Sequence, residues 1–265
     1  MQLIIPAFNE ERRLPTTLRS LRAYVLAACE GVGPVEVIVV DNASTDDTAE
    51  VARGFDSPAM VVRVVTCSKR GKGAAVRAGM AATDADIVAF MDADGATELP
   101  ALVEAVSLIE AGADVAVASR ALPGSVTWER HSRVRAKGAA LYRRLTQAVV
   151  PSVVDTQCGF KVFRGDLARS VFDQTGSTGF SFDVEVLARC AARGLEVVEF
   201  PVMWTDVPGS TFVPSRHGAS SFVELLAIAV RMRRLRRSQS DQRVTLLPLV
   251  ESIPAPSPLP LAAES

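Results

Sequence analysis

Residues 87–100 read IVAFMDADGATELP, and this stretch decides the fold. An apolar run ends abruptly in two aspartates, Asp92 and Asp94, which are separated by one residue. A short apolar run of this kind predicts a buried strand, and carboxylates that follow a strand lie at the edge of the sheet where open α/β folds bind ligands. Hard cations such as Mg²⁺ or Mn²⁺ prefer carboxylate oxygens. The alternative is that Asp94 and Gly95 form only a turn.

Strand and helix patterns alternate on both sides of this stretch. Besides the strand that ends at Asp92, we expect strands at 3–5, 35–40, 60–66, 114–118 and 196–201, and helices at 15–29, after Asp47, at 73–82 and at 99–111. Alternating strands and helices predict an α/β fold with a mostly parallel, Rossmann-like sheet that is flanked by helices. From about residue 120 the periodicity weakens.

The composition bounds the class of protein. The 265 residues are 48% hydrophobic with a formal net charge of −1, which permits a sizeable core and gives no reason to expect a nucleic-acid partner. The four cysteines lie far apart, so a zinc knuckle or a redox pair is disfavoured and reduced thiols are expected. We find no secretory leader and no apolar run of about 20 residues. We therefore expect a cytoplasmic protein whose membrane contact, if any, is peripheral.

Three further loops carry polar residues after expected strands. Residues 6–11 (PAFNEE) follow the first strand and residues 41–48 (DNASTDDT) follow the second, although both are also good helix caps. Asp41, at the end of a buried strand, can accept a hydrogen bond from the imide of a uracil, and a helix start nearby favours anions. Residues 69–73 (KRGKG) place cations on a glycine loop that suits phosphates, or form a solvated basic turn.

In order and spacing, these four loops resemble the nucleotide-sugar half of a family 2 glycosyltransferase. Residues 93–97, 155–163 (DTQCGFKVF), 182–187 (FDVEVL) and 204–214 are similar to the polyprenyl-phosphate members of that family, the dolichyl-phosphate β-glucosyltransferases. The resemblance covers about residues 3–237. The eukaryotic relatives carry an N-terminal membrane helix that is missing here, and the Ala- and Arg-rich composition hints at a bacterium, where the lipid would be undecaprenyl or decaprenyl phosphate.

The resemblance implies a GT-A fold and an inverting, metal-dependent transfer of glucose from UDP-glucose to a polyprenyl phosphate. It implies a nucleotide-sugar-binding half at 1–119 and an acceptor-binding half at 120–237 that ends in an amphipathic basic helix. We expect residues 238–265 to be a disordered tail, because they are rich in Pro and Ser.

The expected site residues fall into groups by role. Asp92 and Asp94 bind Mg²⁺ or Mn²⁺, which stabilises the leaving UDP. The expected catalytic residues are Asp94, Asp183 and Glu185. The expected donor-binding residues are Pro6, Phe8, Glu10, Asp41, Ser44, Lys72, Asp92, Ala93 and Gln157. The expected ligands of the acceptor phosphate are Arg120, Arg133, Arg135 and Lys137, in a region where a solvated basic helix face is the alternative.

Some of these roles stay open. Asp183 and Glu185 are the best base candidates, yet a lipid phosphate is already an anion and needs no base, so both can instead position the sugar hydroxyls. Gln157 either reaches the metal or the sugar, or stabilises a turn.

Residues 220–237 combine apolar residues with arginines, including Phe222, Leu225, Leu226, Ile228, Ala229 and Met232. An interfacial helix would place such an apolar face among lipid headgroups, with about 1 kcal/mol from each basic residue near an anionic surface. The alternative is a core helix with a charged end.

Two other functions remain. A soluble inverting glycosyltransferase would use a small-molecule or polysaccharide hydroxyl as acceptor, and a UDP-sugar-binding protein would have no activity. A Rossmann dehydrogenase is disfavoured, because no G-x-G-x-x-G follows the first strand.

Overall fold

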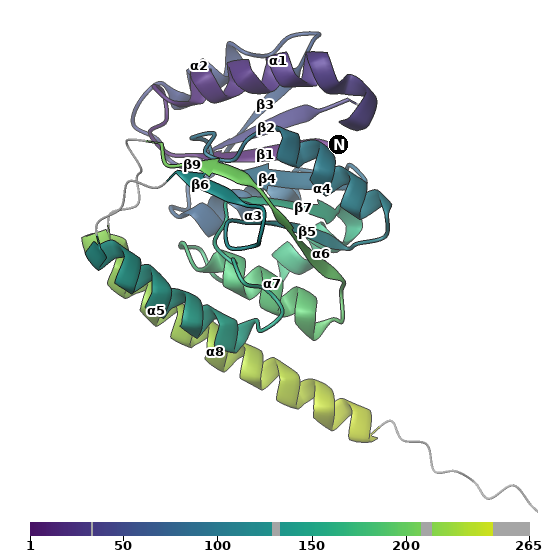
Figure 1. The fold of residues 1–265 in the computed structure, drawn as a ribbon, viewed down its shortest axis with the longest axis vertical. Coiled ribbons are helices and arrows are strands. Elements are labelled where there is room, and N and C mark those ends of the chain that lie inside the picture. The colour runs from purple at the N-terminus through teal and green to yellow at the C-terminus, as the bar shows by residue number, and fades with distance from the viewer. Residues whose placement is uncertain (33, 129–132, 208–213, 246–265) are drawn as a thin grey trace, which may run out of the picture.

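The β-branched runs of the sequence form a seven-stranded sheet in the computed structural model, which describes residues 1–32, 34–128, 133–207 and 214–245 (Figure 1). The strand order is β3-β2-β1-β4-β7-β5-β8. The strands are β1 (Gln2–Ala7), β2 (Glu36–Asp41), β3 (Val61–Thr66), β4 (Ile87–Met91), β5 (Val115–Ser119), β7 (Phe160–Arg164) and β8 (Val197–Pro201). All neighbours are parallel except β7, which runs antiparallel between β4 and β5. The mostly parallel sheet is therefore confirmed.

Helices cover both faces of the sheet (Figure 1). One face carries α1 (Leu14–Val32), α2 (Thr48–Arg53) and α4 (Pro100–Glu110), and the other carries α3 (Lys72–Ala81), α6 (Gly165–Asp173) and α7 (Phe182–Ala192). Leu3 and Ile5 of β1 face the first layer, whereas Ile4 between them faces the second. Both faces of β1 are thus buried, as expected for parallel strands with helices on each side.

Two further helices lie outside these layers. α5 (Arg133–Val149) and α8 (Pro214–Thr245) run side by side below α7 in Figure 1, and the rings of Tyr142 and Phe222 meet edge to face, 5.5 Å apart. A short parallel pair, β6 (Val126–Trp128) and β9 (Met203–Thr205), completes the fold. Within the described residues, no helix is long and apolar enough to cross a bilayer.

The sequence of α8 left open an interfacial helix or a core helix, and two sides of the helix differ in this respect. Leu225, Ile228 and Met232 pack in the core under α7, so these three residues are not available to a membrane. Leu226 and Val230, on another side of the helix, are exposed. The helix is therefore a core helix on one side and presents apolar side chains to solvent on another.

The expected boundaries differ from the structure in two places. β7 belongs to the 120–237 half but lies between β4 and β5 of the 1–119 half, so the two halves share one sheet. The first residues of the expected tail are helical instead, because α8 continues to Thr245. The residues that extend α8, SQSDQRVT, contain neither Gly nor Pro, and the first proline after them is Pro248. Residues 246–265 lie outside the described part.

Candidate active site

The carboxyl ends of β1 and β2 carry two loops that are tied to each other. Asp41 is the last residue of β2 and pairs with Ala7 of β1 in the sheet register. The carboxylate of Asp41 accepts a hydrogen bond from the Ser44 amide (3.2 Å), and the Ser44 hydroxyl oxygen accepts one from the Asn9 amide (3.1 Å). These bonds hold Phe8, Asp41 and Ser44, three of the expected donor-binding residues, at one edge of the sheet.

The basic loop after β3 is fixed to the same edge by Asn42. The buried Asn42 side chain donates to the Lys69 carbonyl (2.7 Å) and accepts from the Gly71 amide (2.8 Å). The Arg70 guanidinium lies 5.7 Å from the centre of the Phe8 ring. Asn42 was not among the expected site residues, because its sequence context reads as a helix cap and its partners lie about 27 residues away.

The two aspartates after β4 lie where the sequence predicts them. Asp92 Oδ1 is 2.6 Å from Lys72 Nζ, and the Asp94 carboxylate accepts from the Ala96 amide (3.1 Å) across a turn in which Gly95 has φ +67°. The turn that the sequence offered as an alternative at Asp94 and Gly95 is therefore present, and both aspartates are part of it. Burial raises the pKa of Asp94 above its usual value, and the charge of Asp92 raises it further.

The residues present fit a hard divalent cation. The donor set is two crowded carboxylates, and a divalent charge would relieve the repulsion that raises the pKa of Asp94. Within the described ranges, no group of three or more His, Cys, Asp or Glu side chains is arranged so that it could hold a metal ion by itself. A magnesium ion bound by one or two carboxylates completes its shell with water and substrate phosphates, so two ligands suffice when a diphosphate is present.

Gly159, in the loop before β7, lies against Asp92. A Cβ atom added at Gly159 would lie 1.9 Å from Asp92 Oδ2, so any side chain there would displace the Asp92 carboxylate. Gln157 is in the same loop, and its side-chain nitrogen is buried with no hydrogen-bond partner among the described residues. The antiparallel β7 thus brings the loop that precedes it to the carboxyl end of β4.

A row of alternating charges leads from Asp92 into the protein. Lys72 lies next to Asp92. Burial acts to lower the pKa of Lys72, but the charges of Asp92, Asp183 and Asp94 and the hydrogen bond to Asp92 together raise it above its usual value. Asp183, at the start of α7, contacts Lys161 of β7 at 2.6 Å, and Lys161 also donates to the Cys158 carbonyl (2.8 Å). Burial raises the pKa of Asp183, while Lys161 and Lys72 act against it.

Three other expected donor-binding residues have internal roles. Glu10 is buried and pairs with Arg13 through two hydrogen bonds; burial raises the pKa of Glu10, with Asp94 and Asp92 adding to the effect. Pro6 lies within β1, and the buried Ala93 accepts a hydrogen bond from Thr17 through its carbonyl (2.8 Å).

Glu185 points away from Asp183. Residues two apart on a helix lie on opposite sides, whereas on a strand, which the sequence left open, they would share a face. Glu185 is fully buried and accepts hydrogen bonds from the Gly176 and Ser177 amides and from Arg189 and Arg231. Burial opposes its ionisation, yet these hydrogen bonds bring the pKa of Glu185 down to about 2. The structure does not bring Glu185 to the sheet edge.

The expected acceptor residues are dispersed. Arg120 is paired with the buried Asp155 (2.7 and 2.9 Å) and lies 5.2 Å from the Trp204 ring. Although burial acts in the other direction, Arg120 keeps the pKa of Asp155 below its usual value. Arg133, Arg135 and Lys137 lie in the first turns of α5, but their side chains are outside the described part of the chain.

Residues 2–172 match the family described as Glycosyl transferase family 2. The chain belongs to this family. It is 35% identical to dolichyl-phosphate beta-glucosyltransferase of Drosophila melanogaster, over 81% of this chain and 69% of that protein. It is 33% identical to undecaprenyl-phosphate mannosyltransferase of Micrococcus luteus, over 77% of this chain and 82% of that protein.

Solved structures of glucosyl-3-phosphoglycerate synthase from Mycobacterium tuberculosis share the fold. The complex with UDP has a TM-score of 0.64 and 22% identity, covering 87% of this chain and 79% of that one. The complex with Mn²⁺, UDP and glucosyl-3-phosphoglycerate has a TM-score of 0.63, covering 87% and 78%. This family 2 glycosyltransferase therefore has the GT-A fold.

Proposed function

We propose that this glycosyltransferase moves glucose from UDP-glucose to a polyprenyl phosphate with inversion, using Mg²⁺ or Mn²⁺ bound by Asp92 and Asp94. The observation that carries the proposal is the Asp92–Asp94 pair beside Lys72 at the end of β4. The choice of acceptor draws on the two curated relatives, whose names are those of polyprenyl-phosphate glycosyltransferases.

Donor binding would use the loops at the sheet edge. Asp41, at the end of β2, is placed to accept a hydrogen bond from the uracil imide, and Phe8 lies in the neighbouring loop. Lys72 would supply a positive charge to the diphosphate. The divalent ion would act as a Lewis acid that stabilises the charge that develops on the UDP leaving group. Gln157, whose amide nitrogen is buried without a partner in the described residues, would donate to the sugar or to the diphosphate.

The acceptor phosphate needs positive charge and no general base, because it is an anion at neutral pH. Arg133, Arg135 and Lys137 of α5 remain the proposed source of that charge. Arg120 is already held by Asp155, so we assign it to fixing the loop before β7.

A hydroxyl acceptor is the second candidate, and one observation favours it. Asp183 is buried, its pKa is raised by burial, and it lies close enough to Lys72 and Asp92 for their charges to affect its ionisation. A carboxylate of raised pKa suits the removal of a proton from a hydroxyl. With a phosphate acceptor, Asp183 would instead hold Lys72 by charge.

Contact with a membrane surface would use a face formed by α5 and α8. Leu141 and Leu145 of α5, and Val223, Leu226 and Val230 of α8, are all exposed. Exposed arginines accompany them: Arg143, Arg144, Arg233 and Arg234. We call these nine residues the α5–α8 surface.

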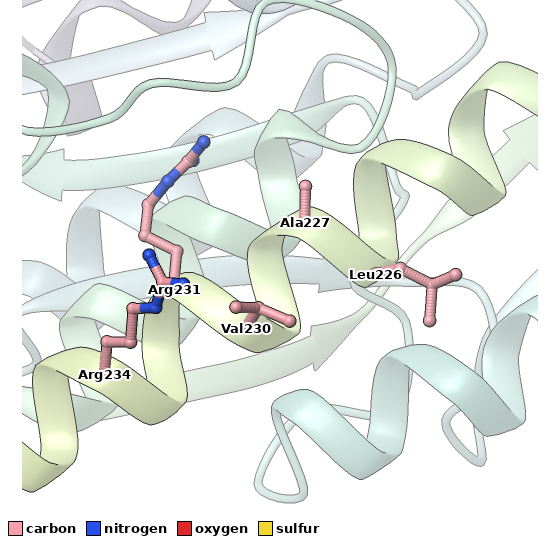
Figure 2. Close-up of a pocket in the computed structure, with 5 residues that line it drawn as sticks. All are labelled: Leu226, Ala227, Val230, Arg231 and Arg234. Carbon is pink, nitrogen blue, oxygen red and sulfur yellow. The ribbon is translucent and has the colours of Figure 1, made fainter.

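A hollow of about 460 Å³ on α8, beside the α5–α8 surface, combines both chemistries. Leu226, Ala227 and Val230 line it together with Arg234 and with Arg231, whose guanidinium is paired with Glu185 (Figure 2). Apolar side chains among arginines match an anionic phospholipid surface, where apolar groups enter the headgroup region and guanidinium groups meet phosphates.

The test is UDP release from UDP-glucose with Mg²⁺ or Mn²⁺, with and without a short-chain polyprenyl phosphate, and identification of the product by mass. We expect release that depends on the lipid, with formation of a hexosyl-phosphoryl lipid. Donor binding without any effect of the lipid would contradict the acceptor, and a screen of hydroxyl acceptors would then decide the second candidate.

A further inference from the structure

We infer that Glu224 of α8 is a positioning residue for donor binding, acting on Lys72 through the backbone of residues 176–181. The inference rests on the proposed function, which assigns Lys72 to the diphosphate. Glu224 lies on α8 and Lys72 at the start of α3, and the 176–181 segment lies between them.

Glu224 holds one side of this segment. Its two carboxylate oxygens accept hydrogen bonds from the Gly179 amide (2.9 Å) and the Ser181 amide (3.0 Å). The Ser181 hydroxyl donates to the Ser221 carbonyl of α8 (3.0 Å) and accepts from Tyr142 of α5 (2.9 Å). The segment has no regular structure, so side-chain contacts hold it: those of Glu224 at Gly179 and Ser181, and those of Glu185 at Gly176 and Ser177.

The other side of the segment holds the turn that carries Lys72. The Gly73 amide donates to the Gly179 carbonyl (3.3 Å), and the Ala74 amide donates to the Thr178 carbonyl (3.3 Å). A Cβ atom on Gly71 would lie 2.1 Å from the Thr178 carbonyl oxygen, and one on Gly73 would lie 2.8 Å from the Ser177 carbonyl oxygen. Gly71 is therefore required by the close approach of the 176–181 segment. Gly73 is required by that segment together with Phe182, whose Cβ would lie 2.5 Å from the added atom.

This contact changes the role of the Gly71–Gly73 loop. A glycine loop at a helix start commonly offers free amides to a phosphate. Here the Gly73 and Ala74 amides are already bound to carbonyls, so they are not free for a phosphate, whereas the Lys72 side chain can reach a donor. Gly179 receives a hydrogen bond from Gly73 and donates one to Glu224, so a shift of the Glu224 carboxylate displaces the residue that supports Lys72.

Glu224→Gln tests the inference with little change in volume. One carboxylate oxygen becomes an amide nitrogen, which cannot accept from a backbone amide, so one partly buried amide loses its partner. We expect about tenfold weaker binding of UDP in the presence of Mn²⁺, which corresponds to about 1.4 kcal/mol, because the segment that supports Lys72 is no longer held in place. Glu104→Gln, at an exposed glutamate of α4, is the matched control and should bind UDP as the wild type does.

A double-mutant cycle with Lys72→Met separates positioning from a general structural role. If Glu224 acts through Lys72, Glu224→Gln should weaken UDP binding less than about twofold in the Lys72→Met background, because the group being positioned is gone. An equal loss in both backgrounds would overturn the inference.

Hydrogen exchange at the Gly73 and Ala74 amides is a readout that needs no donor. Glu224→Gln should accelerate exchange at both amides, and unchanged exchange would also overturn the inference. If the wild type fails to bind UDP while exchange responds as expected, the link from Glu224 to the turn stands and the proposed donor is wrong.

Gly179→Ala is an independent perturbation, should Glu224→Gln fail to fold. Its new Cβ would lie 2.6 Å from Glu224 Oε2, so the flexible carboxylate would be pushed off its two amide partners. The same loss of UDP binding, suppressed by Lys72→Met, is expected, and normal UDP binding by Gly179→Ala would contradict the inference.

Discussion

Acidic side chains at the end of β4 and acidic side chains around β7 and α7 have different surroundings. The Asp92 side chain is 36% exposed, and the Asp94 carboxylate has one hydrogen bond, from Ala96, among the described residues. By contrast, Asp155 is enclosed with Arg120, and the fully buried Glu185 accepts from two amides and two arginines. Both groups lie in motifs that resemble the family. The difference teaches that a motif carboxylate is open to a ligand where the fold leaves it partly exposed and with few internal partners, as at Asp92 and Asp94.

The largest expected effect tests the open group, which consists of Asp92 and Asp94. Asp94→Ala should lower turnover by about 10³-fold or more, because it removes a ligand of the divalent ion that we propose to stabilise the leaving group. The thermal midpoint should change little, because the substitution also removes a carboxylate that burial and Asp92 disfavour. Steady-state kinetics and calorimetry measure the two quantities. Glu98→Ala, at an exposed acid of the same loop, is the control. Full turnover by Asp94→Ala would contradict the distinction between acidic side chains that are open to a ligand and those that are enclosed.

The enclosed group, which includes Asp155 and Glu185, should respond in the opposite way, with a large change in stability. Glu185→Ala should lower the free energy of unfolding by about 3–5 kcal/mol, because it leaves Arg189 and two amides without their partner. Urea denaturation measures this loss. Asp166→Ala, at an exposed acid of α6, should cost far less. A small loss for Glu185→Ala would contradict the enclosed role that we give this residue.

Low pH should remove the stabilisation that the enclosed Glu185 provides. The folded-state pKa of Glu185 is about 2 against a usual value of 4.5, so its stabilisation is complete above pH 4.5 and is lost as the pH falls towards 2. A difference of this size corresponds to about 3 kcal/mol. Denaturant titrations across that range should show a flatter pH dependence for Glu185→Gln than for the wild type. Parallel curves would show that Glu185 does not carry this stabilisation.

The smallest expected effect concerns the outer face of the second half. Leu226→Asp should weaken co-sedimentation with vesicles containing phosphatidylglycerol by about tenfold, because it removes an apolar anchor and adds a charge that anionic lipid repels. Leu26→Asp, at an exposed leucine of α1, is the matched control. Equal vesicle binding by Leu226→Asp and Leu26→Asp would contradict the proposal that the α5–α8 surface contacts a membrane. A wild type that sediments at twice its monomer mass would instead indicate that a second copy covers this surface.

The sequence predicts the first half of the molecule well. Its strands and helices form as expected with ends moved by a few residues, because apolar periodicity is a local property of the chain. Asp92 and Asp94 could be placed for the same reason, since a carboxylate just after a buried strand must lie at the sheet edge.

The partners of the second half could not be predicted, because they depend on long-range packing. Whether Asp183 and Glu185 share a face depends on helix or strand, and the sequence left this open. The glycines around Lys72 read as a phosphate loop, whereas their close neighbour is Thr178, which is distant in the chain. Leu225 and Leu226 read alike, yet one packs in the core and the other meets solvent, because the phase of α8 is set by contacts with α7.

The antiparallel β7 also bears on how the protein is made. β4 and β5 are synthesised first, and both later accept β7 as the strand between them. Until Phe160–Arg164 leaves the ribosome, β4 has a partner on one edge only, and an apolar strand with a free edge invites pairing with other chains. A nascent chain that stalls before β7 would therefore be a target for chaperones and proteases. The strand that leads into Asp92 and Asp94 therefore gains its second neighbour late in translation.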